Sequence, residues 1–184
     1  MDEDQAQLYC TPPHITAALL KREQFPGTIW EPAAGQGHIV QVFRPSNPNI
    51  FASDKYDHGF RPCRVEDFLT STRQADNIVT NPPYKFKVEF LARAKMLARR
   101  KIAMLLPVDV EYSVDFFDNH KADRNFPWKA LYGCVQAVPF QNLRGFWGRI
   151  RVGWFVFERG YEGTVIRVPI KFRKIAAQKA KYGP

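Results

Sequence analysis

The sequence has few cysteines and no long hydrophobic segment. Its three cysteines, Cys10, Cys63 and Cys134, are odd in number and widely spaced, so they predict neither a disulfide framework nor a set of metal ligands. The longest apolar runs, such as residues 102–106, are far too short to span a bilayer, and the first ten residues are too acidic and polar for a secretory signal. We therefore expect a cytoplasmic protein with free thiols, no metal site and no membrane association.

The sequence also lacks internal repeats and low-complexity linkers, which favours one domain over residues 1–184. Its 45% hydrophobic and 14% aromatic residues are typical of a folded chain with a core. Acidic residues are outnumbered, since 27 Lys and Arg stand against 18 Asp and Glu and give a net charge of +9. This excess favours a polyanionic partner, most commonly nucleic acid, although it can serve solubility alone.

The basic residues are concentrated in two places. No acid follows Glu162, whereas six Lys and Arg residues do, and these define a basic tail at about 163–184. A second basic cluster covers residues 85–101 and contains a single acid, Glu89. We expect the tail either to contact nucleic acid or to form a solvated helix.

Short β-type runs alternate with helical patterns, and this alternation predicts an α/β fold with a parallel sheet and helices on its faces. Strands are expected at residues 28–30, 49–53, 77–80, 101–108 and 152–158. Helices are expected after Thr11, which would serve as a cap, from His38 until Pro45 stops it, and over the apolar stripe at 86–97. The segment 111–131 is expected to begin as a helix and then to become irregular, because Pro127 interrupts it.

The loop at residues 31–37 places an acid, Glu31, at the end of the first strand and two glycines, Gly35 and Gly37, before the next helix. Glycine lets the backbone approach a ligand and the helix start supplies free amide donors, although such a loop alone could be only a tight turn. Asp54 ends the second strand, 19 residues after Gly35, where a carboxylate commonly accepts hydrogen bonds from ribose hydroxyls. The other interpretation of Asp54 is an acid in a turn at a strand end.

The loop has no phosphate-binding lysine after its glycines, and Glu31 would repel a diphosphate. A third glycine is also missing, which disfavours a dinucleotide oxidoreductase. A nucleoside cofactor without phosphates fits better. S-adenosylmethionine is a nucleoside cofactor without phosphates. Its ammonium and sulfonium groups would also be attracted by nearby acids such as Glu31.

The tetrapeptide Asn81-Pro82-Pro83-Tyr84, after the strand expected at 77–80, is the most specific signal in the chain. The amine nitrogen of adenine is a poor nucleophile, because its lone pair is delocalised into the ring. The Asn81 carboxamide oxygen and the Pro82 carbonyl can each accept one amine hydrogen and so localise that lone pair on nitrogen. Two prolines make the loop rigid, and Tyr84 offers a face on which a planar group can stack. The other interpretation is a turn that ends a strand and carries a core tyrosine.

Together these residues resemble class I S-adenosylmethionine-dependent amino methyltransferases with an Asn-Pro-Pro-Tyr signature. The order of the motifs is similar to that of DNA adenine methyltransferases in which the cofactor half precedes the catalytic half. The resemblance covers residues 9–108 well and the rest thinly. It implies a Rossmann-like, seven-stranded, mostly parallel sheet with helices on both faces and an antiparallel last strand, which we expect at 152–158.

The resemblance also implies roles for individual residues. Thr11 would lie by the methionine moiety of the cofactor, and Asp54 would bind its ribose. Asp67 would accept a hydrogen bond from the cofactor's adenine amine, while Phe68 would pack on that ring. The implied cofactor loop contains Glu31, Pro32, Ala33, Gly35 and Gly37, and the implied catalytic loop contains Asn81, Pro82, Pro83 and Tyr84.

The aromatic and basic stretch at 140–149 is the candidate for the substrate side. Arg144 and Arg149 would grip phosphates, and Phe146 or Trp147 would stack on or wedge beside an extruded base. The alternative is a hairpin whose aromatic side chains fill the core. Only about 25 residues follow Glu158, too few for the target-recognition domain of sequence-specific relatives. Specificity is therefore expected to be loose, carried by a loop, or supplied by a protein partner.

The leading hypothesis is a DNA adenine amino methyltransferase. Three other hypotheses stay open. The same chemistry could act on adenine in RNA, or on a glutamine side-chain amide of a translation release factor, because enzymes of that kind use the same tetrapeptide. A third possibility is a nucleic-acid-binding protein that retains a decayed methyltransferase fold without activity. Transfer to cytosine is less expected, because that group more often has serine in place of Asn81.

Overall fold

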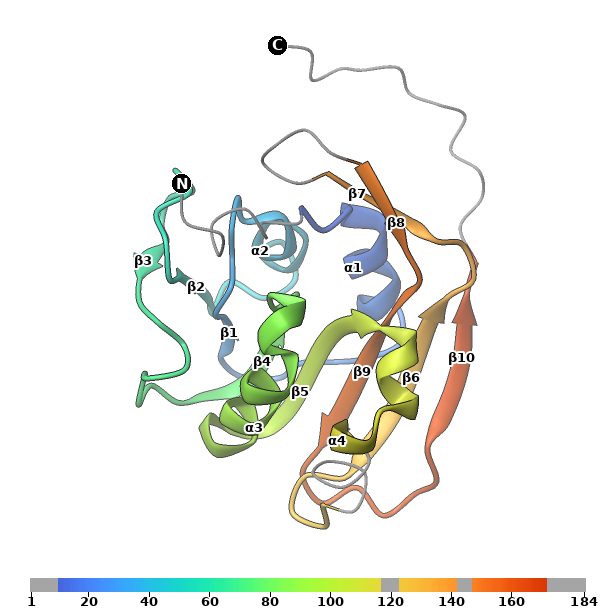
Figure 1. Ribbon diagram of the computed structural model, residues 1–184. Helices are drawn as coiled ribbons and strands as arrows, with labels where there is room; N and C mark the ends of the chain where they lie inside the picture. The colour runs from blue at the N-terminus through green and yellow to red at the C-terminus, as the bar shows by residue number, and fades with distance from the viewer. Residues whose placement is uncertain (1–9, 117–122, 142–146, 172–184) are drawn as a thin grey trace.

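The computed structural model describes residues 10–116, 123–141 and 147–171 (Figure 1). The main sheet contains β1 (Ile29–Glu31), β2 (Ile50–Asp54), β3 (Arg64–Val65), β4 (Ala75–Thr80), β5 (Ala98–Pro107), β6 (Trp128–Cys134), β9 (Val152–Glu158) and β10 (Ile166–Ile170). A separate two-stranded sheet contains β7 (Val138–Gln141) and β8 (Trp147–Ile150). The helices are α1 (Pro13–Leu20), α2 (His38–Phe43), α3 (Lys87–Leu97) and α4 (Val114–Phe116), with 3-10 turns η2 (Tyr84–Phe86) and η3 (Val108–Tyr112). None of the helices described is long and apolar enough to cross a membrane.

The main sheet has the strand order β10-β6-β9-β5-β4-β1-β2-β3 and is mostly parallel. Only β9 runs against its neighbours β5 and β6, with Leu105 opposite Trp154 in the first pair. This confirms the Rossmann-like sheet and the antiparallel strand expected at 152–158, although β10 follows that strand, which is therefore not the last. The sheet has eight strands rather than the expected seven, because β10 pairs in parallel with β6 and extends that edge.

Helices cover both faces of the sheet, as predicted, and each face has its own hydrophobic cluster. The α1/α2 cluster combines those helices with strand residues such as Val79 and Trp154. The α3/α4 cluster combines the other two helices with residues such as Met104 and Phe155. Along β9 the side chains alternate between the two clusters, as expected of a strand buried on both sides.

Three segments differ from the sequence prediction. The region expected to be irregular after Pro127 forms β6, and part of the expected basic tail forms β10. Thr11 does not cap α1, whose N-cap is Pro12 and which has no side-chain cap. The hydroxyl of Thr11 instead accepts a hydrogen bond from a distant residue, described below.

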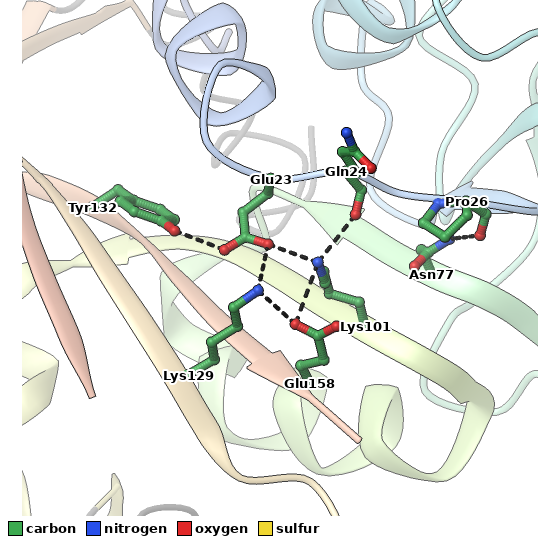
Figure 2. A network of polar contacts seen from close by, with 8 residues as sticks. All are labelled: Glu23, Gln24, Pro26, Asn77, Lys101, Lys129, Tyr132 and Glu158. Carbon is green, nitrogen blue, oxygen red and sulfur yellow. Dashed lines mark hydrogen bonds and ion pairs between the residues drawn. The ribbon is translucent and has the colours of Figure 1, made fainter. Parts of the chain in front are cut away.

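A network of buried and half-buried polar groups lies at the end of the sheet where β5 and β6 begin (Figure 2). Glu23, in the connection between α1 and β1, accepts hydrogen bonds from Lys101 Nζ at 2.6 Å, Lys129 Nζ at 2.9 Å and the Tyr132 hydroxyl at 2.6 Å. Lys129 Nζ also donates to Glu158 Oε2 at 2.6 Å. Two carboxylates and two ammonium groups therefore balance their charges while tying the connection to three strands. Such balance is needed, because an unpaired charge at this depth is strongly destabilising.

Candidate active site

The candidate site lies at the carboxyl edge of the main sheet, where β1, β2 and β4 end together. Glu31, Asp54 and Thr80 are the last residues of these parallel strands. The chain order reverses between β1 and β4, because β2 and β3 extend the sheet on one side while β4 and β5 extend it on the other. Open α/β sheets bind ligands at such a switch point.

A cavity of about 220 Å³ is found at this edge. It brings most of the predicted site residues together: Thr11, Pro32, Ala33, Gly35, Asp54, Asp67, Phe68, Asn81 and Pro83. Of the other predicted residues, Glu31 and Pro82 are buried, Gly37 caps α2, and Tyr84 is half-buried against the α1/α2 cluster. Most of the residues predicted to hold a cofactor thus share one cavity with Asn81 and Pro83 of the predicted catalytic loop.

The glycine loop is fixed by backbone hydrogen bonds. The Gly35 amide donates to Asp54 Oδ2 at 2.9 Å, and the Gly37 amide donates to the Ala34 carbonyl at 2.7 Å. Gly37 has a φ of 80°, in the left-handed region that favours glycine. A Cβ atom at Gly37 would lie 2.3 Å from the Phe60 ring, so Phe60 replaces the bulk that another side chain would provide.

Gly37→Ala is expected to destabilise the protein by about 2–4 kcal/mol, because left-handed strain adds to a clash with Phe60. Gly59 is a matched control, since its φ is 78° but nothing lies within 4 Å of its Cβ position. Gly59→Ala should therefore cost only the strain, about 1–2 kcal/mol. Urea unfolding measures both variants, and equal losses would show that Phe60 imposes no steric limit.

Asp54 connects the glycine loop to the segment after β2. Its Oδ1 accepts a hydrogen bond from the Tyr56 amide at 3.0 Å and lies 3.4 Å from His58 Nε2. The carboxylate lines the cavity, although the residue is only 7% exposed. Because Asp54 Oδ2 accepts the Gly35 amide, Asp54 has a structural role in the glycine loop. Its carboxylate can accept further hydrogen bonds from a ligand.

Asp67 and Phe68 form another part of the cavity wall. The Leu69 amide donates to Asp67 Oδ1 at 2.9 Å, while Asp67 Oδ2 lies 4.0 Å from Lys55 Nζ. The Phe68 ring packs edge-to-face on Trp30, with 5.1 Å between ring centroids, and its centroid lies 4.9 Å from that of Phe90. Packing therefore holds the Phe68 ring in place at the cavity.

Glu31 carries the most unusual electrostatics near the site. The residue is 1% exposed, and neither carboxylate oxygen accepts a hydrogen bond of normal geometry from the part of the chain described here. Burial raises the pKa of Glu31 well above its ordinary value; the Thr80 hydroxyl and Ala33 amide partly oppose this rise, and the Asp54 charge adds to it. An uncompensated buried carboxyl group of this kind suits a ligand that brings a positive charge.

The tetrapeptide after β4 meets the segment before α1. Asn81 Nδ2 donates a hydrogen bond to Thr11 Oγ1 at 3.0 Å, across 70 residues of sequence. The Pro83 carbonyl accepts a hydrogen bond from the Phe86 amide at 2.9 Å, and this bond closes the turn η2. Lys87 Nζ donates to the Tyr84 carbonyl at 3.3 Å. The loop is thus braced on both sides of its prolines.

Sequence reasoning missed several residues of the cavity wall. Phe86 and Phe90 line the cavity, although their spacing in the sequence indicates only the apolar stripe of a helix. Tyr56 and His58 also line it, and their position directly after the acid that ends β2 is the signal that could have found them. The cavity wall therefore includes the aromatic rings of Phe86, Phe90 and Tyr56 in addition to the residues that the motifs predicted.

The predicted substrate stretch is only partly described. Arg144 and Phe146 lie outside the described residues. Trp147 is in β8 opposite Gln141, and Arg149 is exposed in β8 opposite Pro139. Phe140 is fully buried in the α1/α2 cluster, so for this aromatic the alternative of a hairpin that fills the core is confirmed.

No protein-family model matches the sequence, and no curated protein matches it. Solved structures do match the fold. A "putative RNA methyltransferase" from Pyrococcus horikoshii has a TM-score of 0.68 at 13% identity, over 86% of this chain and 90% of that one. The M protein of the type I restriction enzyme EcoKI has a TM-score of 0.61 at 15% identity, over 85% of this chain and 45% of that one.

A third solved structure was determined with bound S-adenosylmethionine. It is the magnesium protoporphyrin IX methyltransferase of Synechocystis PCC 6803, with a TM-score of 0.55 at 10% identity, over 85% of this chain and 79% of that one. The chain spans less than half of the EcoKI subunit but most of the other two proteins. At these identities the likeness shows the fold: the protein has a Rossmann-like methyltransferase fold.

Proposed function

We propose that the protein transfers a methyl group from S-adenosylmethionine to the exocyclic amino group of adenine in DNA. The observation that carries this proposal is the cavity itself, because Asp54, Asp67 and Phe68 line it together with Asn81 and Pro83. A methyl transferase needs its donor and its acceptor in one water-poor space, and most of the rate then comes from alignment. The enzymes with this fold described above include DNA- and RNA-related methyltransferases, which supports the general chemistry.

The residues of the site fit S-adenosylmethionine. The buried Glu31 carboxyl accepts no hydrogen bond of normal geometry from the described residues, and it suits a ligand with ammonium and sulfonium charges. Asp54 would accept hydrogen bonds from the ribose, Asp67 from the adenine amine, and Phe68 would pack on the adenine ring. Pro32, Ala33 and the two glycines would bring the backbone close to the ligand. The bound S-adenosylmethionine of the Synechocystis enzyme supports this assignment.

The cofactor, when bound, supplies a methyl carbon on a sulfonium that leaves as a neutral thioether. Asn81 and the Pro82 carbonyl would each accept one hydrogen of the target amine and direct its lone pair at that carbon. Tyr84 would stack on the base, and the surrounding aromatic side chains would exclude water. The amine nitrogen would form the new bond to carbon as the carbon–sulfur bond breaks, and the nitrogen would then lose one proton to solvent as the product leaves the cavity. No general base is required before transfer.

The affinity for S-adenosylmethionine is expected to rise with pH through the raised pKa of Glu31. Below that pKa Glu31 is neutral; a cationic ligand favours the ionised form, so binding releases a proton. Calorimetric titration between about pH 5 and about pH 8 should show this rise in the wild type and a smaller one in Glu31→Gln. The cofactor's own amino group titrates in both proteins, so the difference between them reports Glu31. Parallel curves would contradict this role.

DNA is the favoured substrate because the chain carries a net charge of +9 and the tetrapeptide suits an adenine amine. The target base would have to be flipped out of a duplex or presented on a single strand. Sequence specificity would be loose, carried by a loop, or supplied by a protein partner. The EcoKI M protein, which belongs to a restriction enzyme, supports DNA, while the Pyrococcus structure makes RNA the second candidate.

The test is transfer of labelled methyl to duplex DNA, single-stranded DNA, RNA and a translation release factor in parallel. Label in DNA supports the proposal. Label in RNA or the release factor alone would keep the chemistry and overturn the substrate. Binding of cofactor without transfer to any of the four, even with cell extract added as a source of partners, would favour the non-catalytic alternative.

A further inference from the structure

The contact between Thr11 and Asn81 has a consequence for the reaction proposed above. A carboxamide has an acceptor end, the oxygen, and a donor end, the nitrogen. Only the oxygen can accept a hydrogen of the target amine. The side chain of Asn81 must therefore be held in one of its two orientations. An amide rotated by about 180° would present its nitrogen to the target amine, and this nitrogen cannot accept a hydrogen bond.

The structure holds the donor end of this amide on Thr11. Asn81 Nδ2 donates to Thr11 Oγ1 at 3.0 Å, so the oxygen lies at the end of the amide that faces away from Thr11. Thr11 is 4% exposed and lines the same cavity as Asn81. At this depth water cannot readily replace the hydroxyl as the acceptor, so the contact is a strong constraint on the amide.

Both partners are mounted on rigid supports. Thr11 precedes Pro12 and α1, where Ile15 and Leu19 are fully buried. The Ile15 carbonyl accepts a hydrogen bond from Trp154 Nε1 at 3.0 Å, which ties α1 to β9. Asn81 follows the buried strand β4 and is followed by two prolines. A hydroxyl fixed in this way can set the angle of a side chain more finely than a mobile residue could.

We infer that Thr11 is a positioning residue, whose hydroxyl holds the Asn81 carboxamide with its oxygen toward the target amine. This inference rests on the proposed function and goes beyond it, since the family resemblance implied only that Thr11 lies by the cofactor. It also explains why Thr11 does not cap α1: its hydroxyl is directed to Asn81 instead.

The test compares Thr11→Val, which keeps the shape and removes the hydroxyl, with Thr11→Ser, which keeps the hydroxyl. Thr16→Val is the matched control, because Thr16 is a buried threonine of the adjoining α1 and its hydroxyl has no hydrogen-bonding partner among the described residues. Thr11→Val should lower kcat by about 10- to 100-fold and leave the dissociation constant of S-adenosylmethionine unchanged. Thr11→Ser should restore kcat, and Thr16→Val should not change it.

A second measurement does not depend on catalysis. In the ligand-free protein, the side-chain amide resonance of Asn81 should shift and exchange faster with solvent in Thr11→Val, but not in Thr16→Val. An unchanged resonance would overturn the inference, whatever the enzyme does. The inference would also be overturned if Thr11→Val kept the wild-type kcat or weakened only cofactor binding. A Thr11→Ser variant as slow as Thr11→Val would overturn it as well. A wild type that transfers no methyl overturns the proposed function, and the resonance then decides the Thr11 contact alone.

Discussion

Asn81→Ala is expected to lower kcat for methyl transfer by about 10²- to 10³-fold, the effect of removing one preorganised polar group from a reacting centre. The variant loses the acceptor proposed to take one amine hydrogen, so the adenine lone pair stays delocalised in the ring. Binding of S-adenosylmethionine should persist, because Asp54, Asp67 and the glycine loop are untouched. Single-turnover kinetics at saturating cofactor measure the rate, and calorimetric titration measures the binding.

The matched control is Asn49→Ala, which removes an exposed asparagine in the turn before β2. Its kcat should equal that of the wild type. An Asn81→Ala variant with nearly normal kcat would remove the tetrapeptide from the reaction. A variant that loses the cofactor as well as the rate would show that Asn81 supports the cavity rather than the amine.

Glu23→Ala is expected to destabilise the protein by about 3–5 kcal/mol, because it leaves the Lys101 and Lys129 ammonium groups to share the one carboxylate of Glu158. The Glu23 side chain is 2% exposed, and it bonds Lys101, Lys129 and Tyr132 (Figure 2). Urea unfolding measures the loss. Glu162→Ala, at an exposed acid, is the control and should change stability by less than about 0.5 kcal/mol. Equal stabilities would show that the two lysines find other partners.

The contribution of Glu23 should depend on pH. Burial raises the pKa of its carboxyl, but hydrogen bonds from Lys101, Tyr132 and Lys129 outweigh burial and hold the pKa below its ordinary 4.5. A depressed pKa adds stability that is complete above the unfolded value and is lost as pH falls through the folded one. The stability gap between the wild type and Glu23→Gln should therefore shrink from about pH 7 to about pH 3. A constant gap would contradict this explanation.

The sequence alone predicted the half of the fold that contains the motifs. Residues 102–106 are at most 1% exposed, and such a short continuous apolar run is typical of a strand buried on both faces of a sheet. The loops after β1, β2 and β4 could be predicted to lie close together, because parallel strands present their carboxyl ends at one edge of the sheet. The cavity was therefore predictable as a meeting of motifs, although its size and its extra aromatic wall were not.

The segments that were missed depend on partners far away in sequence. β10 contains Arg167, whose charge favoured either a nucleic-acid contact or a solvated helix, yet Arg167 donates to Glu111 at 2.6 Å across 56 residues and lies over the Trp128 ring. Thr11 has the chemistry of a helix cap, but its partner is 70 residues away. Local patterns describe what a side chain can do, and only the tertiary structure decides which of its options is used.

The measurement that tests the central claim most directly is mass spectrometry of nucleosides digested from DNA after incubation with the protein and S-adenosylmethionine that carries a deuterated methyl group. The proposal predicts deuterated methyl on the exocyclic nitrogen of adenine, and none when Asn81→Ala replaces the wild type. Deuterium on cytosine, on a ring nitrogen of adenine, or equally in the Asn81→Ala sample would contradict it.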